Sequence, residues 1–234
     1  MADLSHFPIT QRWTPQDAGV IQLYSFPTPN GVKVSIMLEE TGLAYEPHRV
    51  SLSDVDVKSD AFLSLNPNGK IPAIIDPNGP DGTPIGIFES GAILIYLAEK
   101  TGKFIGETAT DKAHAIQWLM FQMGGLGPMF GQLGFFVRFA GAEIDDPRPR
   151  QRYIDEATRL LGVLNGALDG KDWIAGEYSI ADMALAPWLG ALDYYEAKDL
   201  VGWTDFPNVG AYLDRFFARP AVGRGRNVPP REAG

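Results

Sequence analysis

The 234-residue chain contains no cysteine and only three histidines. The absence of cysteine excludes structural disulfides, metal sites built on thiolates and a cysteine nucleophile in the protein itself. The histidines, His6, His48 and His114, are scattered and have no spacing suited to a shared metal ion. Any sulfur chemistry would therefore need a sulfur atom that arrives with a ligand.

Long apolar runs and an excess of positive charge are also missing. No stretch approaches the ~20 apolar residues of a membrane-spanning helix, and residues 1–20 lack the basic start and apolar segment of a secretion signal. The 29 acidic residues outnumber the 20 basic ones, for a net charge of −9, which disfavours nucleic-acid and membrane-surface partners. We expect a cytoplasmic protein, in which a local cluster of donors could still hold a small anionic ligand.

The first part of the chain shows alternating strand and helix signals. The expected strands cover residues 21–26, 45–50, 72–75 and 85–88, and the expected helices cover 31–40, 59–65 and 90–100. Gly42 is well placed to end the first helix, and the last two strands are close enough in sequence to pair antiparallel. This β-α-β-α-β-β-α order predicts a thioredoxin-like α/β domain.

The second part shows helical periodicity without strand signals. The expected helices cover residues 111–123, 149–168, 180–194 and 209–218. Ser179, followed by Asp182, resembles a capping box at the start of one of them. The predicted organisation is an N-terminal extension at 1–20, a thioredoxin-like domain at 21–102, an all-helical domain at 110–226 and a tail at 227–234. The extension wraps over a dimer or is disordered, and the arginine-containing stretch from residue 223 is interpreted as solvated.

A Thr-Pro-Asn-Gly motif at residues 28–31 lies where the first strand gives way to the first helix. Lowering a thiol pKa by two units requires ~2.7 kcal/mol. One neutral hydrogen bond gives roughly 0.5–1.5 kcal/mol, and a helix N-terminus gives at most ~2 kcal/mol. Thr28 or Asn30 together with the helix terminus would therefore stabilise a thiolate; the alternative is a turn selected for its geometry alone.

Two further motifs follow at the joints of the same domain. A cis Ile71–Pro72 bond would turn backbone groups of Ile71 outward to pair with a peptide ligand, whereas a trans proline would only begin an edge strand. Ser90 and the N–H groups of a helix first turn can hold a carboxylate, and Glu89 can accept from an ammonium group. Both are also residues that first turns favour for structural reasons.

These motifs, with the helix sequence at 89–100, resemble those of the Nu class of bacterial glutathione transferases. The resemblance continues through residues 124–129, 179–182 and 219–221 and covers roughly 21–226. It implies a thioredoxin-like domain joined to an all-helical domain, in a homodimer. It also implies glutathione-dependent reduction of small disulfides, with weak conjugation or peroxidase activity. The cosubstrate would be one or two glutathione molecules, or glutathione disulfide.

The resemblance also implies roles for individual residues. Thr28 and Asn30 correspond to the residues near the sulfur atom. The remaining correspondences are to residues that bind glutathione: Lys70, Ile71 and Pro72 at the glycyl and cysteinyl parts, Glu89 and Ser90 at the γ-glutamyl group, and Arg152 from the helical domain. Tyr24, which lies where other transferase classes have a catalytic tyrosine, is interpreted as a packing residue.

Two departures keep other functions open. Phe135 stands where relatives often have a histidine, and the loop at 53–58 lacks a polar residue that some relatives use to reach glutathione. The apolar side chain favours a second hypothesis, a transferase or lyase acting on an apolar aromatic electrophile or thioether. A third hypothesis is a non-catalytic, glutathione-binding regulatory protein, since this fold also serves regulation.

Overall fold

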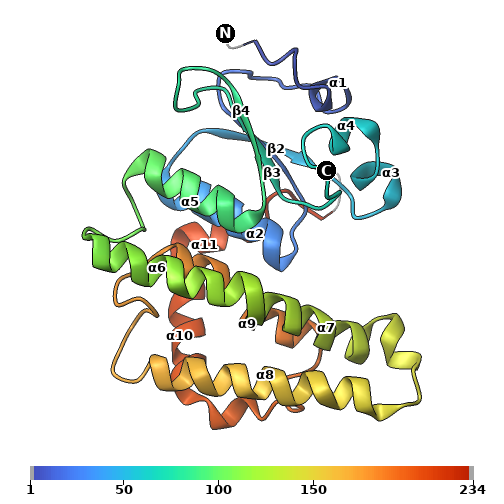
Figure 1. Cartoon of the computed structure of the whole chain (residues 1–234), viewed down its shortest axis with the longest axis vertical. Helices are drawn as coiled ribbons and strands as arrows, with labels where there is room; N and C mark the ends of the chain where they lie inside the picture. The colour runs from blue at the N-terminus through green and yellow to red at the C-terminus, as the bar shows by residue number, and fades with distance from the viewer. Residues whose placement is uncertain (1–2, 232–234) are drawn as a thin grey trace. The chain divides into compact units, whose positions relative to one another are not determined.

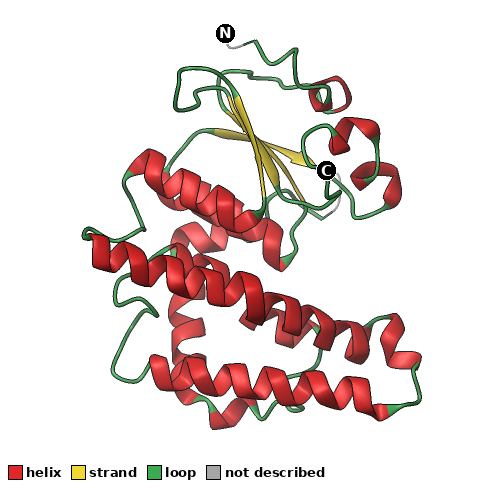
Figure 2. Cartoon of the chain, in the orientation of Figure 1, coloured by secondary structure: helices red, strands yellow, loops and turns green. Residues whose placement is uncertain are grey.

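The computed structural model describes residues 3–231 and contains two compact units. The first unit runs to Gly102 and also takes in the chain from Pro220, and the second is Lys103–Arg219. All described strands belong to the first unit, as Figure 2 shows. Residues 1–2 of the predicted extension and 232–234 of the predicted tail lie outside the described residues.

A four-stranded mixed sheet forms the centre of the first unit (Figure 1). Its strands are β1 (Ile21–Ser25), β2 (Tyr45–Arg49), β3 (Ala73–Asp76) and β4 (Ile85–Phe88), in the order β2-β1-β3-β4. Strand β1 pairs parallel with β2 and antiparallel with β3, and β3 pairs antiparallel with β4. The predicted thioredoxin-like fold and the antiparallel last pair are both confirmed.

The helices of the first unit begin and end largely where the sequence predicts. Helix α2 (Pro29–Thr41) ends at Gly42, whose φ of 75° is the left-handed conformation that glycine adopts readily. Helix α5 (Ser90–Thr101) packs against α2. Between β2 and β3, α4 (Asp60–Leu63) lies within the helix predicted at 59–65, and a further short helix that was not predicted, α3 (Asp54–Val57), precedes it. They are separate because the Ser59 hydroxyl starts a second helix by accepting from Phe62 N at 3.2 Å.

The described part of the N-terminal extension is an ordered part of the first unit. It contains helix α1 (Ile9–Arg12), and Ile9 is fully buried in the same apolar cluster as Tyr24 and Phe62. The Trp13 indole donates to the Arg49 carbonyl at 3.1 Å. These contacts contradict the interpretation that the extension is disordered.

The stretch from residue 223 is docked in part: Gly225 is buried, whereas Arg224, Arg226 and Arg231 are exposed, as the interpretation of a solvated stretch expects. Helix α11 (Pro220–Gly225) packs against α2, where the Ser35 hydroxyl donates to the Gly225 carbonyl at 2.7 Å and Arg224 pairs with Glu39. A Cβ on Gly225 would lie 2.7 Å from the Ile36 backbone. A contact made through a glycine backbone leaves no hydrophobic periodicity, and the sequence therefore gave no sign of it.

The second unit consists of helices joined by loops, with no strand among its described residues. Its segments are α6 (Ala109–Phe121), a π-helical turn η1 (Gln122–Leu126), α7 (Gly127–Arg138), a 3₁₀ turn η2 (Ala140–Glu143), α8 (Pro147–Ala167), α9 (Ile180–Tyr194), a 3₁₀ turn η3 (Trp203–Asp205) and α10 (Pro207–Phe217). The predicted capping box at Ser179 and Asp182 is confirmed at the start of α9. The sequence analysis missed α7 because Gly127-Pro128 indicates a break, but proline also fits a helix first turn. None of the described helices combines the length and apolar character that a membrane crossing requires.

Candidate functional site

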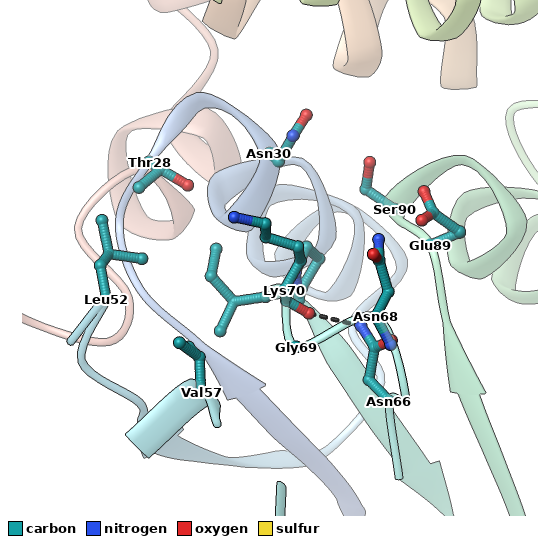
Figure 3. A pocket seen from close by; sticks show the side chains of 12 residues that line it. Thr28, Asn30, Leu52, Val57, Asn66, Asn68, Gly69, Lys70, Glu89 and Ser90 are labelled. Atoms are coloured by element: carbon teal, nitrogen blue, oxygen red, sulfur yellow. Dashed lines mark hydrogen bonds between the residues drawn. The ribbon is translucent and has the colours of Figure 1, made fainter. Parts of the chain in front are cut away.

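A pocket of about 360 Å³ in the first unit collects most of the predicted site residues (Figure 3). It is lined by Thr28, Asn30, Leu52, Val57, Asn66, Asn68, Gly69, Lys70, Ile71, Pro72, Glu89 and Ser90. Figure 3 shows Thr28 and Leu52 on one side of it and Glu89 and Ser90 on the other. Seven of the eight predicted residues therefore line one pocket. Arg152, the eighth, lies on α8 in the second unit, and its contact with glutathione stays a prediction.

The Thr-Pro-Asn-Gly motif forms the start of α2, and each of its residues has a separate local reason. Thr28 caps the helix, accepting from Gly31 N at 3.2 Å, and Pro29 occupies the first helical position. Gly31 is required because a Cβ there would lie 1.9 Å from the Phe26 carbonyl oxygen. Asn30 lines the pocket.

Thr28 can still donate a hydrogen bond into the pocket. Because its hydroxyl oxygen accepts from Gly31 N, its own hydrogen serves a different acceptor. The hydroxyl also lies at the positive end of the 13-residue helix α2. A thiolate beside Thr28 would gain from both the hydroxyl and the helix terminus.

The Ile71–Pro72 segment forms the floor between the two helix starts. Its peptide bond is cis, the first of the two alternatives considered for this motif. The paired register of β3 ends at Ala73, so the backbone of Ile71 lies beyond the ladder and at the pocket. This is the position from which a strand edge can pair with an extended peptide.

The sequence analysis missed two asparagines that shape this floor. The buried Asn66 donates through its amide to the Lys70 carbonyl at 2.5 Å, and its amide oxygen accepts from Asn68 N at 2.9 Å. Asn66 thereby fixes the loop that carries Lys70. The Asn-Pro-Asn-Gly sequence at 66–69 was the available signal, because these residues favour turns that bond to their own backbone.

Helix α5 begins at the opposite side of the pocket with an unusual backbone. Glu89, which precedes its first residue, has a φ of 71°, and no side chain caps the helix. A non-glycine residue in this region costs of order 1–3 kcal/mol, and such residues concentrate at functional sites. The Glu89 side chain is exposed and Ser90 is buried, and both line the pocket.

A lysine absent from the sequence prediction lies directly behind Ser90. Lys33, on α2, is fully buried, and its ammonium group donates to the Ser90 hydroxyl oxygen at 3.3 Å. Burial lowers the pKa of Lys33 to about 7, and the negative charge of Glu89 acts in the opposite direction. The sequence feature that could have indicated this residue is a single lysine between two valines in an otherwise apolar stretch of α2.

The remaining wall of the pocket is apolar. Leu52 and Val57, just before and within the loop at 53–58, line it. Tyr24 does not line this pocket: it is fully buried and stacks on His48 at a ring-centroid distance of 4.7 Å. Burial raises the pKa of Tyr24, which agrees with a packing role. Phe135 lies in the second unit, on α7.

Known proteins are similar to this chain in both sequence and fold. The N-terminal domain of glutathione S-transferases matches residues 19–99, and the C-terminal domain matches residues 147–215. The disulfide-bond oxidoreductase YfcG of Escherichia coli is 43% identical over 207 residues, which cover 88% of this chain and 94% of that protein.

Two solved structures are more similar still. A glutathione transferase from Burkholderia graminis, with two glutathione molecules bound per subunit, has a TM-score of 0.97 and 62% identity, covering 99% of this chain and 98% of that one. Another from Pseudomonas putida, with one glutathione disulfide bound per subunit, has a TM-score of 0.96 and 56% identity, covering 97% and 99%. The chain therefore belongs to the glutathione S-transferase family.

Proposed function

We propose that this protein is a glutathione-dependent disulfide-bond oxidoreductase that reduces small disulfides in the pocket of the first unit. One observation carries the proposal. The pocket brings together a hydroxyl at a helix start, a strand edge and an acidic residue beside a helix start, in a chain without cysteine. Relatives with two glutathione molecules or one glutathione disulfide bound support it, because both reacting sulfur atoms then come from ligands.

Each part of glutathione has a matching group in the pocket. Glu89 accepts from the ligand's ammonium group, and Ser90 with the first-turn N–H groups of α5 holds the adjacent carboxylate. The backbone of Ile71, before Pro72, pairs with the cysteinyl part, and Lys70 attracts the glycyl carboxylate. With the ligand held in this way, its sulfur atom would lie near Thr28 and Asn30.

The reaction is two successive thiol–disulfide exchanges. The thiolate of one glutathione attacks a sulfur atom of the substrate disulfide, forming a mixed disulfide and releasing the first substrate thiolate, which takes up a proton. The thiolate of a second glutathione attacks the glutathione sulfur atom of the mixed disulfide, releasing the second substrate thiol and glutathione disulfide. Two glutathiones are oxidised and one disulfide is reduced, and the protein supplies thiolate stabilisation and alignment.

The resemblance to the Nu class also supports a homodimer in the cytoplasm. The oligomeric state is measured directly by light scattering coupled to size exclusion. A monomer at working concentration would contradict this part of the proposal.

A second candidate function is conjugation to, or removal of glutathione from, an apolar aromatic compound. Leu52 and Val57 favour it because they give the pocket an apolar wall, and Phe135 replaces a polar side chain that relatives often have. These side chains suit an aromatic second substrate.

Reduction of 2-hydroxyethyl disulfide by glutathione, coupled to NADPH consumption through excess glutathione reductase, tests the proposal. Wild type, Thr28→Ala/Asn30→Ala and the control Thr41→Ala, at the far end of α2, are compared in this assay and in conjugation of a chloro-nitroaromatic compound. We expect fast disulfide reduction that collapses only in the double variant. Negligible disulfide reduction with substantial conjugation would favour the second candidate, and failure to bind glutathione at all would overturn both.

A further inference from the structure

Lys33 is a buried lysine that contacts one of the residues lining the pocket. It does not itself line the pocket, but its ammonium group contacts Ser90, which does. The two residues belong to different helices, since Lys33 lies in the second turn of α2 and Ser90 is the first residue of α5. Lys33 therefore links the two helix starts that border the pocket.

The chemistry of this contact fixes the direction of the Ser90 hydroxyl. An ammonium group carries only donors, so the Ser90 oxygen accepts from Lys33. The single hydroxyl hydrogen of Ser90 then serves a different acceptor. An anion at the Ser90 side of the pocket would receive this hydrogen and would also feel the positive charge directly behind it.

A buried ammonium group is unfavourable unless an anion compensates it. The neighbours of Lys33 along α2, Val32 and Val34, are both buried, so an apolar side chain would suit this position better. The negative charge of Glu89 favours the charged form of Lys33. Ser35, two residues further along α2, differs from Lys33 in its partner: its hydroxyl donates to the Gly225 carbonyl of α11 and not to a residue that lines the pocket.

We propose that Lys33 is a positioning residue for carboxylate recognition, which orients the Ser90 hydroxyl toward the α-carboxylate of the ligand's γ-glutamyl group and supplies the compensating charge. The inference rests on the proposed function and deepens it. It makes the α5 side of the pocket selective for peptides that carry a free carboxylate beside the γ-glutamyl amine. Removing that carboxylate from the ligand should make Lys33 dispensable for binding.

Two ligands that differ only in this carboxylate test the proposal. One is S-methylglutathione, which has no titrating thiol. The other is S-methylated 4-aminobutyryl-cysteinyl-glycine, which keeps the amine and lacks the α-carboxylate. Dissociation constants are measured by titration calorimetry, with the weaker ligand in competition, for wild type, Lys33→Met, Ser90→Ala and the double variant. Lys70→Met, at the glycyl end, is the matched lysine control.

Lys33→Met should weaken the binding of S-methylglutathione by about tenfold or more, as expected for the loss of a hydrogen bond to a charged group. It should weaken the binding of the analogue by less than about twofold. The fold-loss of affinity in the double variant should be smaller than the product of the fold-losses in the two single variants, because both residues act through one contact. Lys70→Met should weaken the binding of the two ligands by the same factor.

Equal weakening of both ligands by Lys33→Met, in a variant with a wild-type circular dichroism spectrum, would show a merely structural role and overturn the proposal. If Lys33→Met does not fold, Lys33→Gln takes its place, and failure of both to fold would assign Lys33 to the fold and overturn the proposal equally. Failure of the wild type to bind S-methylglutathione would instead overturn the proposed function itself.

Discussion

Helices α2 and α5 both begin at the pocket, but only α2 is capped by a side chain. Thr28 satisfies Gly31 N at the start of α2, and proline follows with the backbone conformation a helix requires. At the start of α5, Glu89 has a φ of 71° and no side-chain cap forms. The start of α2 is thus capped by a side chain of its N-cap residue, and the start of α5 is not.

The difference separates two tasks of one ligand site. The capped start of α2 offers one oriented hydroxyl and a helix terminus, which is what a reacting sulfur atom needs. The uncapped start of α5 offers several backbone donors to a carboxylate that does not react. Substitutions at α2 should therefore change turnover, and those at α5 should change glutathione affinity.

The largest expected effect concerns Lys33, which joins the two helix starts. The folded protein holds it at a pKa of about 7 because it is buried, against the ordinary value of 10.5 in the unfolded chain. Between these values the unfolded chain binds more protons, so the free energy of unfolding should rise with pH by up to ~1.4 kcal/mol per unit. Glu89, the acidic neighbour, opposes the shift in part.

In Lys33→Met this rise should disappear, so the stability of the variant relative to wild type should be greatest near pH 7 and decline toward pH 10. Urea unfolding at pH 7, 8 and 9 measures the trend. Lys58→Met, which replaces a side chain that is 66% exposed in wild type, should follow the wild-type slope. A difference that stays constant with pH would contradict the lowered pKa of Lys33.

Asn30→Ala should lower kcat for disulfide reduction by about 10- to 100-fold, which corresponds to ~1.4–2.7 kcal/mol of transition-state stabilisation. The apparent KM for glutathione should change little, because the proposed role of Asn30 is at the sulfur atom. Steady-state kinetics with saturating disulfide separates the two parameters. Normal turnover would remove Asn30 from the mechanism.

Glu89→Ala should have the reverse effect, raising the apparent KM for glutathione by about tenfold with little change in kcat. Glu89→Gly should raise KM similarly but should be more stable than Glu89→Ala by about 1 kcal/mol, since glycine accepts the left-handed backbone. Kinetics and thermal melting of both variants test this pair. Equal stability would show that the backbone at this position is not strained.

The smallest expected effect lies outside both helix starts. Arg12 pairs with Asp56, whose carboxylate also accepts from Ser51 N at 2.8 Å and so supports the wall formed by Leu52 and Val57. Arg12→Ala should reduce stability by less than about 1 kcal/mol, because the pair is partly exposed. The apparent KM for glutathione should rise by no more than about twofold. A larger loss of affinity would mean that the N-terminal segment controls the pocket wall more strongly.

Elements with local signals were predictable from the sequence. The helix end at Gly42 and the capping box at Ser179 and Asp182 follow from rules that act within a few residues. The predicted pocket residues were found for the same reason, since each motif lies at a joint between a strand and a helix. Their meeting in one pocket also needed the thioredoxin-like order of elements, which the periodicity supplied.

The features that were missed depend on contacts between distant parts of the chain. Lys33 carries no local sign that it reaches Ser90, and the glycine contact of α11 with α2 involves residues almost 190 positions apart. The N-terminal segment looked polar and irregular because only Ile9 and a few others reach the core. Such contacts become visible only when the fold brings the segments together.

The docking of α11 onto α2 also bears on the order in which the protein is made. The whole of Lys103–Arg219 is synthesised between the two pieces of the first unit, so the ribosome releases the last piece after the helical unit is complete. Until then the α2 surface around Ser35 and Ile36 has no partner from α11. Because domains tend to fold as units as the chain emerges, the helical unit is the first that can finish folding. The unit that carries the pocket can finish only after α11 has emerged, although its sheet is synthesised before the helical unit.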